Sequence, residues 1–427
     1  MSVQLSLCMI VRDEIDGLEA CLDSLAPWVD EIAVLDTGSV DGTWELVQVR
    51  AHRSAQIVWP DHFAEARNQA LDLVSGDWVL VVDADERLVS GGDELRAAIQ
   101  DPTLLAAEIC LHNDMGDGTH GEFWAVRLFR RHPDLRYTGR IHEQVAGSVR
   151  ELMTREPRWR TGRVSLVLHH DGYVPAKFHA KGKAERNVRL LERALSDLDV
   201  DAPVHQRVYL EYKLSAALGA GPTGQVWLLR AARRLLDEGE AMVTQVPLGP
   251  EILVSAAQVW VRGGEGSAAL EAADLAAVGA PDHPMVALVR GQALLATGDL
   301  EGAEDAMSAA GRAAGTAAGQ GFYFDRDAHT VVLAIGRAEL AHRRGQHGDA
   351  VQILEQACAS VPGSSQAALA RLYAMVHAGQ AEEALREGVA YMKAYPDDRN
   401  GLLACAGAAE ALGMDERAQR WRAKALG

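Results

Sequence analysis

Cysteine is scarce in this chain of 427 residues, and the few cysteines show no pairing pattern. They stand at Cys8, Cys21, Cys110, Cys358 and Cys405, and none belongs to a CxxC pair. A small, odd number of scattered cysteines excludes a disulfide framework or a zinc knuckle as the basis of the fold. Cys8 and Cys21 stand among apolar residues, so we expect both thiols in a core, within a protein of a reducing compartment.

Positive charge and long apolar runs are lacking as well. The chain has 42 lysines and arginines against 60 aspartates and glutamates, a net charge of -18. Nucleic acids and anionic membranes are bound by basic faces, so we expect neither as a partner. No stretch of about 18 apolar residues marks a transmembrane helix. Residues 5–11 are too short, and lack the basic flank, for a signal peptide. The sequence therefore favours a cytoplasmic protein.

Apolar residues are nonetheless plentiful, at 48% of the chain, and a chain of this length forms two or three domains. In its first quarter, apolar runs alternate with segments of helical spacing. These patterns predict strands at 5–11, 31–35, 56–59 and 78–82, and helices at 16–26, 43–52 and 64–74. Repeated strand–helix units are typical of a mostly parallel, doubly wound α/β sheet. Residues 105–175 follow as a mixed region of strands and loops.

Carboxylates stand where the fourth predicted strand ends. Asp83 and Asp85 follow the apolar run 78–82, and Arg12 and Asp36 follow or end the first two strands. In parallel sheets, ligands gather at the carboxyl ends of the strands. Carboxylate oxygens suit Mg²⁺ or Mn²⁺, and neighbouring acids repel each other unless a cation is present. Such an ion would stabilise a departing diphosphate. The alternative is an Asp-rich turn with solvated acids.

Alanine, leucine and arginine dominate the chain beyond residue 178, and a repeat is found there. A glycine followed five residues later by an alanine occurs at Gly264/Ala269, Gly298/Ala303, Gly345/Ala350, Gly379/Ala384 and Gly413/Ala418. Three of the four intervals are 34 residues long, the period of tetratricopeptide helix pairs. We predict a sheet domain at 1–178, a helical connecting region at 179–255 and tetratricopeptide-like repeats at 256–427. Such repeats form a concave groove. They would either capture a substrate in it or act as a tail that forms a homodimer or stabilises the chain.

Four short motifs in the first half of the chain resemble bacterial family 2 glycosyltransferases. They are residues 7–14 (LCMIVRDE), 36–43 (DTGSVDGT), 63–68 (FAEARN) and 83–86 (DADE). Residues 127–130 (RLFR), 141–143 (IHE) and 170–173 (HDGY) resemble the subgroup with a tetratricopeptide tail. That subgroup includes the enzymes that glycosylate peptide side chains in bacteriocins. The resemblance implies a GT-A fold that binds a UDP-sugar with Mn²⁺ or Mg²⁺ and inverts the anomeric centre.

The resemblance also implies which residues bind the nucleotide. Asp36, at the end of the second predicted strand, would read the uracil or its ribose, although an aspartate there also suits the capping of a turn. Val11, Arg12 and Glu14 would line the base and ribose pocket. For Glu14, the alternative is the favourable place of an acid in the first turn of a helix.

A metal and diphosphate site follows from the same resemblance. Asp85 would ligate the metal directly, while Asp83 and the intervening Ala84 would meet the ribose or a metal-bound water. His170, or the histidine just before it, would be a further metal or diphosphate ligand at the end of a late apolar strand. Tyr173 would contact phosphate in the turn that follows.

The transfer reaction needs a base on the acceptor side, and a carboxylate within hydrogen-bond reach of the acceptor can serve. We choose Glu143 as this base, with His142 next to it in contact with the donor sugar or the base. Two aspartates in the polar loop 113–118 are competing candidates. The alternative role of Glu143 is an ion pair with Arg140 or Arg127.

These expectations combine into a metal-dependent inverting glycosyltransferase. It would transfer a hexose, with glucose as the default, from a UDP-sugar to a hydroxyl or thiol. The acceptor would be a small natural product such as a nucleoside, or a peptide side chain. One alternative is a tetratricopeptide scaffold with an inactive head. Another is a nucleotidyltransferase, which is disfavoured because no Gly-rich pyrophosphorylase loop stands near the N-terminus.

Overall fold

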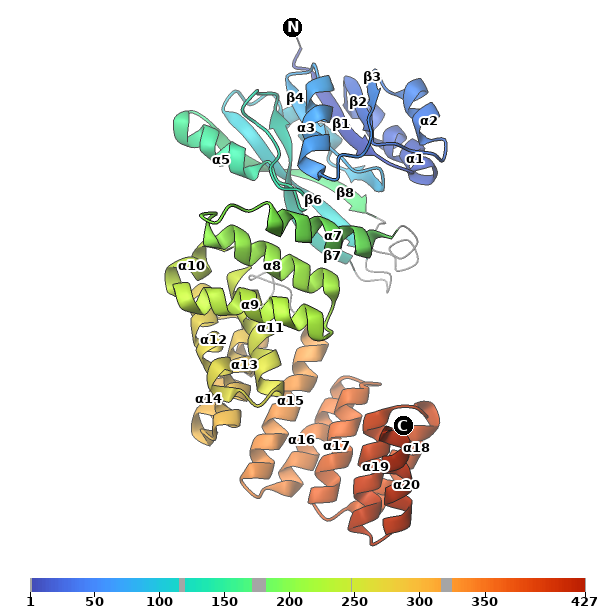
Figure 1. Cartoon of the computed structure of the whole chain (residues 1–427), viewed down its shortest axis with the longest axis vertical. Helices are drawn as coiled ribbons and strands as arrows, with labels where there is room; N and C mark the ends of the chain where they lie inside the picture. Colours follow the sequence, from blue (N-terminus) through green and yellow to red (C-terminus); the bar gives the residue numbers. More distant parts are fainter. Residues whose placement is uncertain (1, 115–119, 171–181, 247, 316–324, 427) are drawn as a thin grey trace. The chain divides into compact units, whose positions relative to one another are not determined.

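The computed structural model describes residues 2–114, 120–170, 182–246, 248–315 and 325–426. The chain forms two compact units, Met1–Val200 and Asp201–Gly427 (Figure 1). Within the described residues, every strand belongs to the first unit, whereas the second unit is built of helices. The predicted order, an α/β sheet domain followed by a helical region, is therefore confirmed.

An eight-stranded sheet forms the centre of the first unit, as far as the structure describes it. Its strands are β1 (Leu5–Val11), β2 (Glu31–Asp36), β3 (Arg53–Gln56), β4 (Trp78–Val81), β5 (Glu86–Ser90), β6 (Leu104–Asp114), β7 (His120–Arg130) and β8 (Arg160–His170). They lie in the order β3-β2-β1-β4-β7-β6-β8-β5. Strands β3, β2, β1 and β4 pair in parallel, whereas β7 pairs antiparallel with both β4 and β6. The sheet thus joins a parallel half of the predicted kind to a half of mixed direction.

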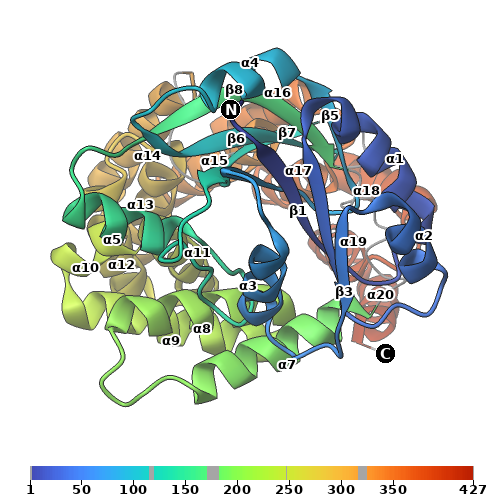
Figure 2. The same ribbon diagram turned by 90° about the horizontal axis from the view of Figure 1, so that it is seen from above.

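Apolar residues of β1 alternate between two cores. Leu5, Leu7 and Met9 belong to the core on one face of the sheet, and Cys8 belongs to the core on the other. Helices cover both faces: α1 (Ile15–Leu25), α2 (Thr43–Arg50) and α4 (Gly92–Ala98) the first, and α3 (Phe63–Leu73) and α5 (Ala146–Arg155) the second (Figure 2). A strand buried on both faces appears as a continuous apolar run. Cys8 and Cys21 are both buried, as predicted.

Parallel pairing brings three strand ends to one edge of the sheet. The register places Val11 beside Asp36 and Cys8 beside Val81, so β1, β2 and β4 end side by side. Helix α1 leaves β1 on one face of the sheet, whereas α3 enters β4 from the other face. A crevice opens where the connections part in this way, and it is the location that the sequence analysis favoured for a ligand.

Strand β3 begins and ends three residues earlier than predicted. The apolar residues predict the strand at 56–59, but the strand is Arg53–Gln56. It lies at the edge of the sheet, and Arg53, Ser54 and Gln56 are exposed, so it lacks an apolar signal. The apolar residues that follow, Trp59 among them, line pockets instead.

Glu31, the first residue of β2, connects the parallel strands at the edge of the sheet formed by their amino ends. Its carboxylate accepts hydrogen bonds from Ser6 Oγ at 2.5 Å, from the Ser75 backbone N–H at 2.8 Å and from Arg53 Nε at 2.8 Å. Burial opposes ionisation, but these donors prevail and lower the pKa of Glu31 to about 2. A single carboxylate therefore joins β1, β2 and β3 to the turn that precedes β4.

Replacing Glu31 with glutamine should lower the free energy of unfolding at neutral pH by about 1–3 kcal/mol, the size expected for hydrogen bonds to a charged group. Because the pKa is depressed on folding, this contribution is present above pH 4.5 and is lost as the pH falls toward 2. The difference in free energy of unfolding between the wild type and E31Q should therefore become smaller at acid pH. Urea unfolding at neutral and acid pH measures it, with the exposed Glu45→Gln on α2 as control. A gap that does not change with pH would contradict this assignment.

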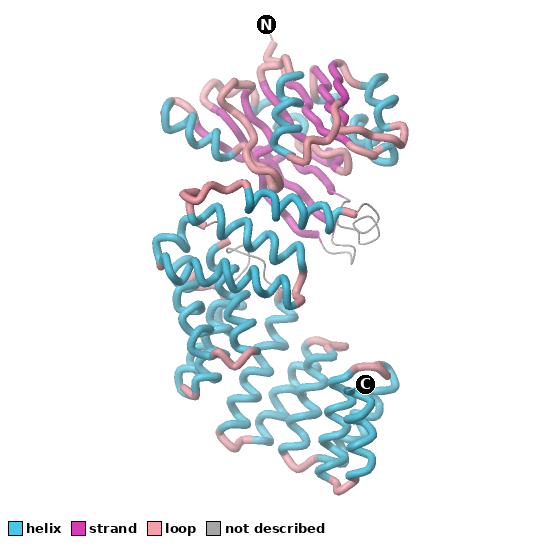
Figure 3. Tube along the Cα trace, in the orientation of Figure 1, coloured by secondary structure: helices cyan, strands magenta, loops and turns pink. Residues whose placement is uncertain are grey.

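The remaining helices are α7 and the members of the second unit. The short η1 (Ala26–Trp28) follows α1, and α7 (Lys183–Ser196) closes the first unit. The second unit contains α8 (Val204–Leu218), α9 (Pro222–Glu238), α10 (Glu240–Gln245), α11 (Gly249–Arg262), α12 (Gly266–Gly279), α13 (Pro284–Thr297), α14 (Leu300–Ala314), α15 (Arg326–Arg343), α16 (His347–Ser360), α17 (Ser365–His377), α18 (Ala381–Ala394), α19 (Arg399–Ala411) and α20 (Asp415–Leu426). Figure 3 shows them as a succession of paired helices.

The repeated glycine and alanine have distinct structural roles. Each repeat glycine lies in the turn between two paired helices with a positive φ, from 70° at Gly413 to 90° at Gly298. Such a conformation strains any residue with a Cβ atom. Each repeat alanine is buried; Ala269 and Ala303 are 0% exposed. The small side chain lets the second helix of each pair pack closely against its neighbours, as the sequence pattern predicted.

The predicted domain boundaries, at residues 178 and 255, can be compared with the helices of the structure. The first predicted boundary, at residue 178, lies outside the described residues. The second, at residue 255, falls inside α11, and one core runs without a break from Val208 to Ala293. The prediction missed this continuity because the glycine–alanine pattern begins only at Gly264. None of the described helices combines the length and apolar character needed to cross a bilayer.

Candidate functional site

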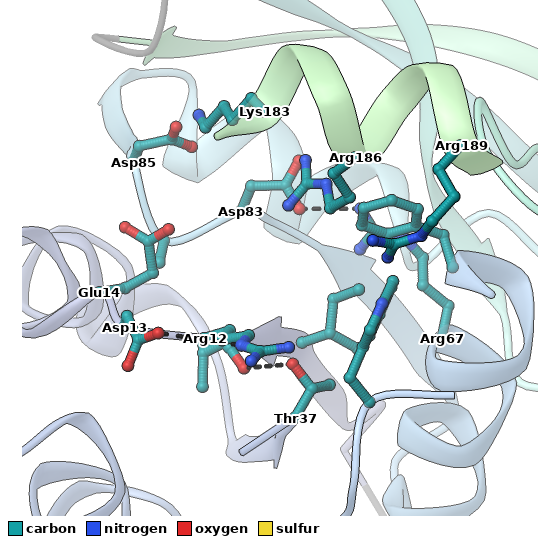
Figure 4. Close-up of a pocket in the computed structure, with 15 residues that line it drawn as sticks. Arg12, Asp13, Glu14, Thr37, Arg67, Asp83, Asp85, Lys183, Arg186 and Arg189 are labelled. Carbon is teal, nitrogen blue, oxygen red and sulfur yellow. Dashed lines mark hydrogen bonds and ion pairs between the residues drawn. The ribbon is translucent and has the colours of Figure 1, made fainter. Parts of the chain in front are cut away.

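A pocket of about 770 Å³ opens at the carboxyl ends of β1 and β4. Its lining comes from the end of β1 and the start of α1 (Ile10, Val11, Arg12, Asp13, Glu14), from Thr37, Trp59, Phe63 and Arg67, from Asp83, Ala84 and Asp85 after β4, and from Lys183, Arg186 and Arg189 of α7. Six predicted site residues are thus brought together: Val11, Arg12, Glu14, Asp83, Ala84 and Asp85. Figure 4 shows Asp13, Glu14 and Asp85 along one side and Arg186 and Arg189 along the other.

The first wall of the pocket is a pair of loops tied together. The Thr37 backbone N–H donates to the Val11 carbonyl at 2.9 Å, and the Asp13 backbone N–H donates to Ser39 Oγ at 2.9 Å. In return, Asp13 Oδ1 accepts from the Val40 backbone N–H at 2.8 Å. Asp13 has a φ of 53°, a left-handed conformation that aspartate tolerates better than most residues. The motif of residues 36–43 therefore builds the loop that holds the end of β1 in place.

Asp36 lies beneath this loop and does not line the pocket. Its side chain is fully buried, and Oδ1 accepts from the backbone N–H groups of Gly38 and Ser39 at 2.8 and 2.9 Å and from Gln56 Nε2 at 3.0 Å. Oδ2 is covered and has no partner among the described residues. The structure thus gives Asp36 the turn-capping contacts named as the alternative. Its contact with a nucleotide stays a prediction.

A chain of largely buried ion pairs begins at Arg67 and Asp83, on the second wall of the pocket. Arg67 Nη2 is 2.8 Å from Asp83 Oδ1, and Arg67 Nε is 2.6 Å from Glu143 Oε1. Arg127 Nη2 is 3.1 Å from both Asp83 Oδ2 and Glu86 Oε1. Burial would raise the pKa of Asp83, but Arg67 and Arg127 hold it well below its usual range. Both oxygens of Asp83 are therefore occupied by guanidinium groups.

Glu143 and His142 are not among the residues that line the pocket. The Glu143 side chain is only 11% exposed, and its ion-pair partner is Arg67 rather than the predicted Arg140 or Arg127. Arg140 instead pairs with Asp197 at 2.5 Å. His142 is exposed, with a φ of 55°. Glu143 is placed to support Arg67, and its role as a base stays a prediction.

Asp85 is the described acid best placed for a metal. It lines the pocket and, unlike Asp83, is held by neither Arg67 nor Arg127. No group of three or more His, Cys, Asp or Glu suited to a metal occurs in the described part of the chain. However, Mg²⁺ often takes only one or two carboxylates, with waters and substrate phosphates completing its shell. The residues present fit such an ion. The His170 side chain and all of Tyr173 lie outside the described residues; the His170 backbone pairs with Glu86.

Three cations of α7 were missed by the sequence analysis, which assigned the helix to a connecting region. Lys183, Arg186 and Arg189 follow one another at three-residue spacing and all line the pocket. Asp61 anchors the helix, because it pairs with Arg189 at 2.7 Å and with Arg193 at 2.5 Å. The spacing of these cations is a signal visible in the sequence, but nothing local indicates that the helix returns to the carboxyl edge of the sheet.

Comparison with known proteins identifies the first domain. Residues 6–91 match Glycosyl transferase family 2. A TPR repeat-containing protein of Synechococcus elongatus is 40% identical over 238 residues, which are 55% of this chain and 56% of that protein. The SPbeta prophage-derived glycosyltransferase SunS of Bacillus subtilis is 24% identical over 196 residues, 44% of each chain. Among solved structures, a crystal structure of a tetratricopeptide repeat protein from Parabacteroides merdae matches with a TM-score of 0.43 and 17% identity. The matched region covers 59% of this chain and 89% of that protein's chain.

The chain spans about half the length of the curated relatives it matches. The family segment contains every lining residue of the pocket except the three cations of α7. It also contains the motifs on which the resemblance rested, apart from those at 127–130, 141–143 and 170–173. The chain therefore has a Glycosyl transferase family 2 domain at its N-terminus, followed by a tetratricopeptide-like helical region.

Proposed function

We propose that the chain is a metal-dependent inverting glycosyltransferase that transfers a hexose, with glucose as the default, from a UDP-sugar. The observation that carries this proposal is the pocket at the carboxyl ends of β1 and β4, inside the family segment, where Asp83 and Asp85 face the residues after β1. Its volume of about 770 Å³ lies in the range of pockets that take cofactor-sized ligands.

Asp85 would hold Mn²⁺ or Mg²⁺, and the ion, when bound, would neutralise charge on the diphosphate of the donor. Arg67 and Arg127 keep Asp83 ionised, so its carboxylate remains a hydrogen-bond acceptor at the pocket wall. Val11, Arg12 and Glu14 would bound the base and ribose. Trp59 and Phe63, whose rings meet edge to face at 4.7 Å, form the apolar part of the lining.

The acceptor would be a small natural product or a peptide side chain, attacked through oxygen or sulfur. This part of the proposal rests on the resemblance to the subgroup with a tetratricopeptide tail. The helical repeats would then either position the acceptor or join two copies of the chain.

A screen of nucleotide sugars by thermal unfolding, with and without Mn²⁺, tests the function. A ligand that binds only the native state raises the melting temperature by mass action, so we expect a UDP-sugar to do so in the presence of the metal. A chain that responds to no nucleotide sugar would instead be the scaffold named above. Product analysis separates the third option, because a nucleotidyltransferase releases pyrophosphate rather than UDP.

Glu143→Gln decides between the two roles of this residue. If Glu143 is the base, turnover should fall about 10²–10⁴-fold while the dissociation constant of the donor hardly changes. If it only supports Arg67, donor affinity and melting temperature should fall together, and turnover at saturating donor should change little. Steady-state kinetics, donor titration and thermal melts measure these quantities. Glu151→Gln on α5, an exposed site in the same domain, is the control.

A further inference from the structure

The charges that line the pocket differ in how they are compensated. Arg67 is paired with Asp83 and Glu143, and Arg189 with Asp61. Lys183 and Arg186 form no ion pair with the described residues, although they belong to a chain with a net charge of -18. Among the described residues, these two cations of α7 therefore line the pocket without an ion-pair partner, and for Arg186 the attraction of Glu14 is outweighed by burial and by neighbouring cations.

Arg186 is the more constrained of the two. Its Nε is covered yet has no hydrogen-bond partner among the described residues, and Nη2 makes only a long contact of 3.4 Å to Asn187 Oδ1. Cζ of the guanidinium lies over the Phe63 ring, 5.3 Å from its centre, a cation–π contact. Burial, followed by repulsion from Arg12 and Arg189, lowers its pKa. A partly buried cation among like charges requires an anion for its stabilisation.

The position of this anion is limited by the opposite side of the pocket. Figure 4 shows Arg186 facing the end of the pocket where Asp83 and Asp85 lie, with Lys183 extending toward Asp85. A lone carboxylate ligand would meet the guanidinium and offer no second charged group to the metal that the proposed function places on Asp85. An anion with two charged groups in succession meets both: one beside a metal on Asp85, the other beside Arg186. Guanidinium groups suit phosphate oxygens especially well, because their N–H donors match two oxygens at once.

We propose that Arg186, aided by Lys183, binds the diphosphate of the nucleotide and takes up negative charge as the sugar leaves. The C1–O bond of the donor breaks as the acceptor bond forms, and the electron pair stays on the diphosphate oxygen, within reach of these cations. Phe63 is a positioning residue for Arg186. This inference rests on the proposed function, and it assigns a role to a helix outside the family segment 6–91.

Titration of the full chain with UDP and with uridine, both in Mn²⁺, tests the inference. Arg186→Met should weaken UDP binding about 10- to 100-fold, the loss expected for charge-assisted hydrogen bonds, and should leave uridine binding within about twofold. Arg186→Lys should recover part of the loss. Lys183→Met should weaken UDP binding to a smaller extent, because an ammonium group cannot bind two phosphate oxygens in the bidentate way that a guanidinium can. Arg150→Met, which removes an exposed cation of α5 outside the pocket, is the matched control and should bind UDP as the wild type does.

The outcomes are distinguishable. Equal weakening of UDP and uridine by Arg186→Met, or unchanged UDP binding, would overturn the role of Arg186 while leaving the proposed function intact. If R186M does not fold, Lys183→Met carries the test, and unchanged UDP affinity in that variant would overturn the inference. Failure of the wild-type chain to bind either compound would overturn the proposed function together with this inference.

Discussion

Asp85→Ala is expected to lower metal-dependent sugar transfer about 10³-fold or more, because the charge neutralisation supplied by a metal is worth several kcal/mol and each 1.36 kcal/mol corresponds to a tenfold change in rate. Asp83 cannot take over, since Arg67 and Arg127 occupy both of its oxygens. The fold should survive, because the Asp85 side chain lies in the pocket rather than in the core. Turnover measured across a Mn²⁺ titration tests the assignment, and removal of the metal by a chelator should reproduce the loss in the wild type.

Asp93→Ala on α4 is the matched control, because Asp93 is an exposed aspartate of the same domain. It should leave turnover and its dependence on Mn²⁺ unchanged. Full activity of the Asp85 variant would refute the metal assignment. A loss that is accompanied by a large fall in melting temperature would show instead that Asp85 supports the fold.

Arg67→Met should destabilise the first unit by about 3–5 kcal/mol, the usual cost of removing one partner from a buried charge pair. The variant leaves Glu143 without its counter-charge and Asp83 with Arg127 alone. In the wild type, the depressed pKa of Asp83 contributes stability that is present above the pKa of an unfolded aspartate and is lost only as the pH falls. In the variant, burial is less opposed, so the pKa of Asp83 should rise. The difference in free energy of unfolding between the wild type and the variant should therefore become smaller at acid pH.

Chemical unfolding at neutral and acid pH measures both effects, with Arg150→Met, at an exposed position of α5, as control. A double-mutant cycle with Glu143→Gln isolates the Arg67–Glu143 pair, and residues in contact in this way commonly couple by about 0.5–3 kcal/mol. A deficit below about 1 kcal/mol, or no coupling, would show that the ion-pair chain contributes little to stability.

Much of the architecture could be predicted from local patterns. The apolar run at residues 5–11 predicted the strand β1, and the acids after β4 indicated a ligand site at the carboxyl edge. The repeated glycines and alanines located the interhelical turns and the close helix contacts. Each of these signals depends on residues near one another in the chain, where strand and helix periods act directly.

Partners across the fold could not be predicted in the same way. Arg67 and Glu143 are 76 positions apart, and Arg189 and Asp61 are 128 apart. The ion pair named as the alternative role of Glu143 therefore has a partner, Arg67, that the sequence did not indicate, and the cations of α7 stand in a segment predicted to be a connecting region. The same limit applies to Asp36. Its position at the end of a strand could be predicted from nearby residues, but its burial could not, because the loop that follows and β3 pack over it.

The sequence by itself determined the two kinds of domain, the strand ends that carry carboxylates and the period of the helical repeats, because periodicity and turn chemistry are properties of short segments. Only the tertiary structure decided which charges meet: that Asp83 is held by two arginines, that Glu143 supports one of them, and that α7 brings three cations to the pocket. The physical reason is that the energy of an ion pair depends on distance and burial in space, and many different pairings are compatible with the same order of residues along the chain.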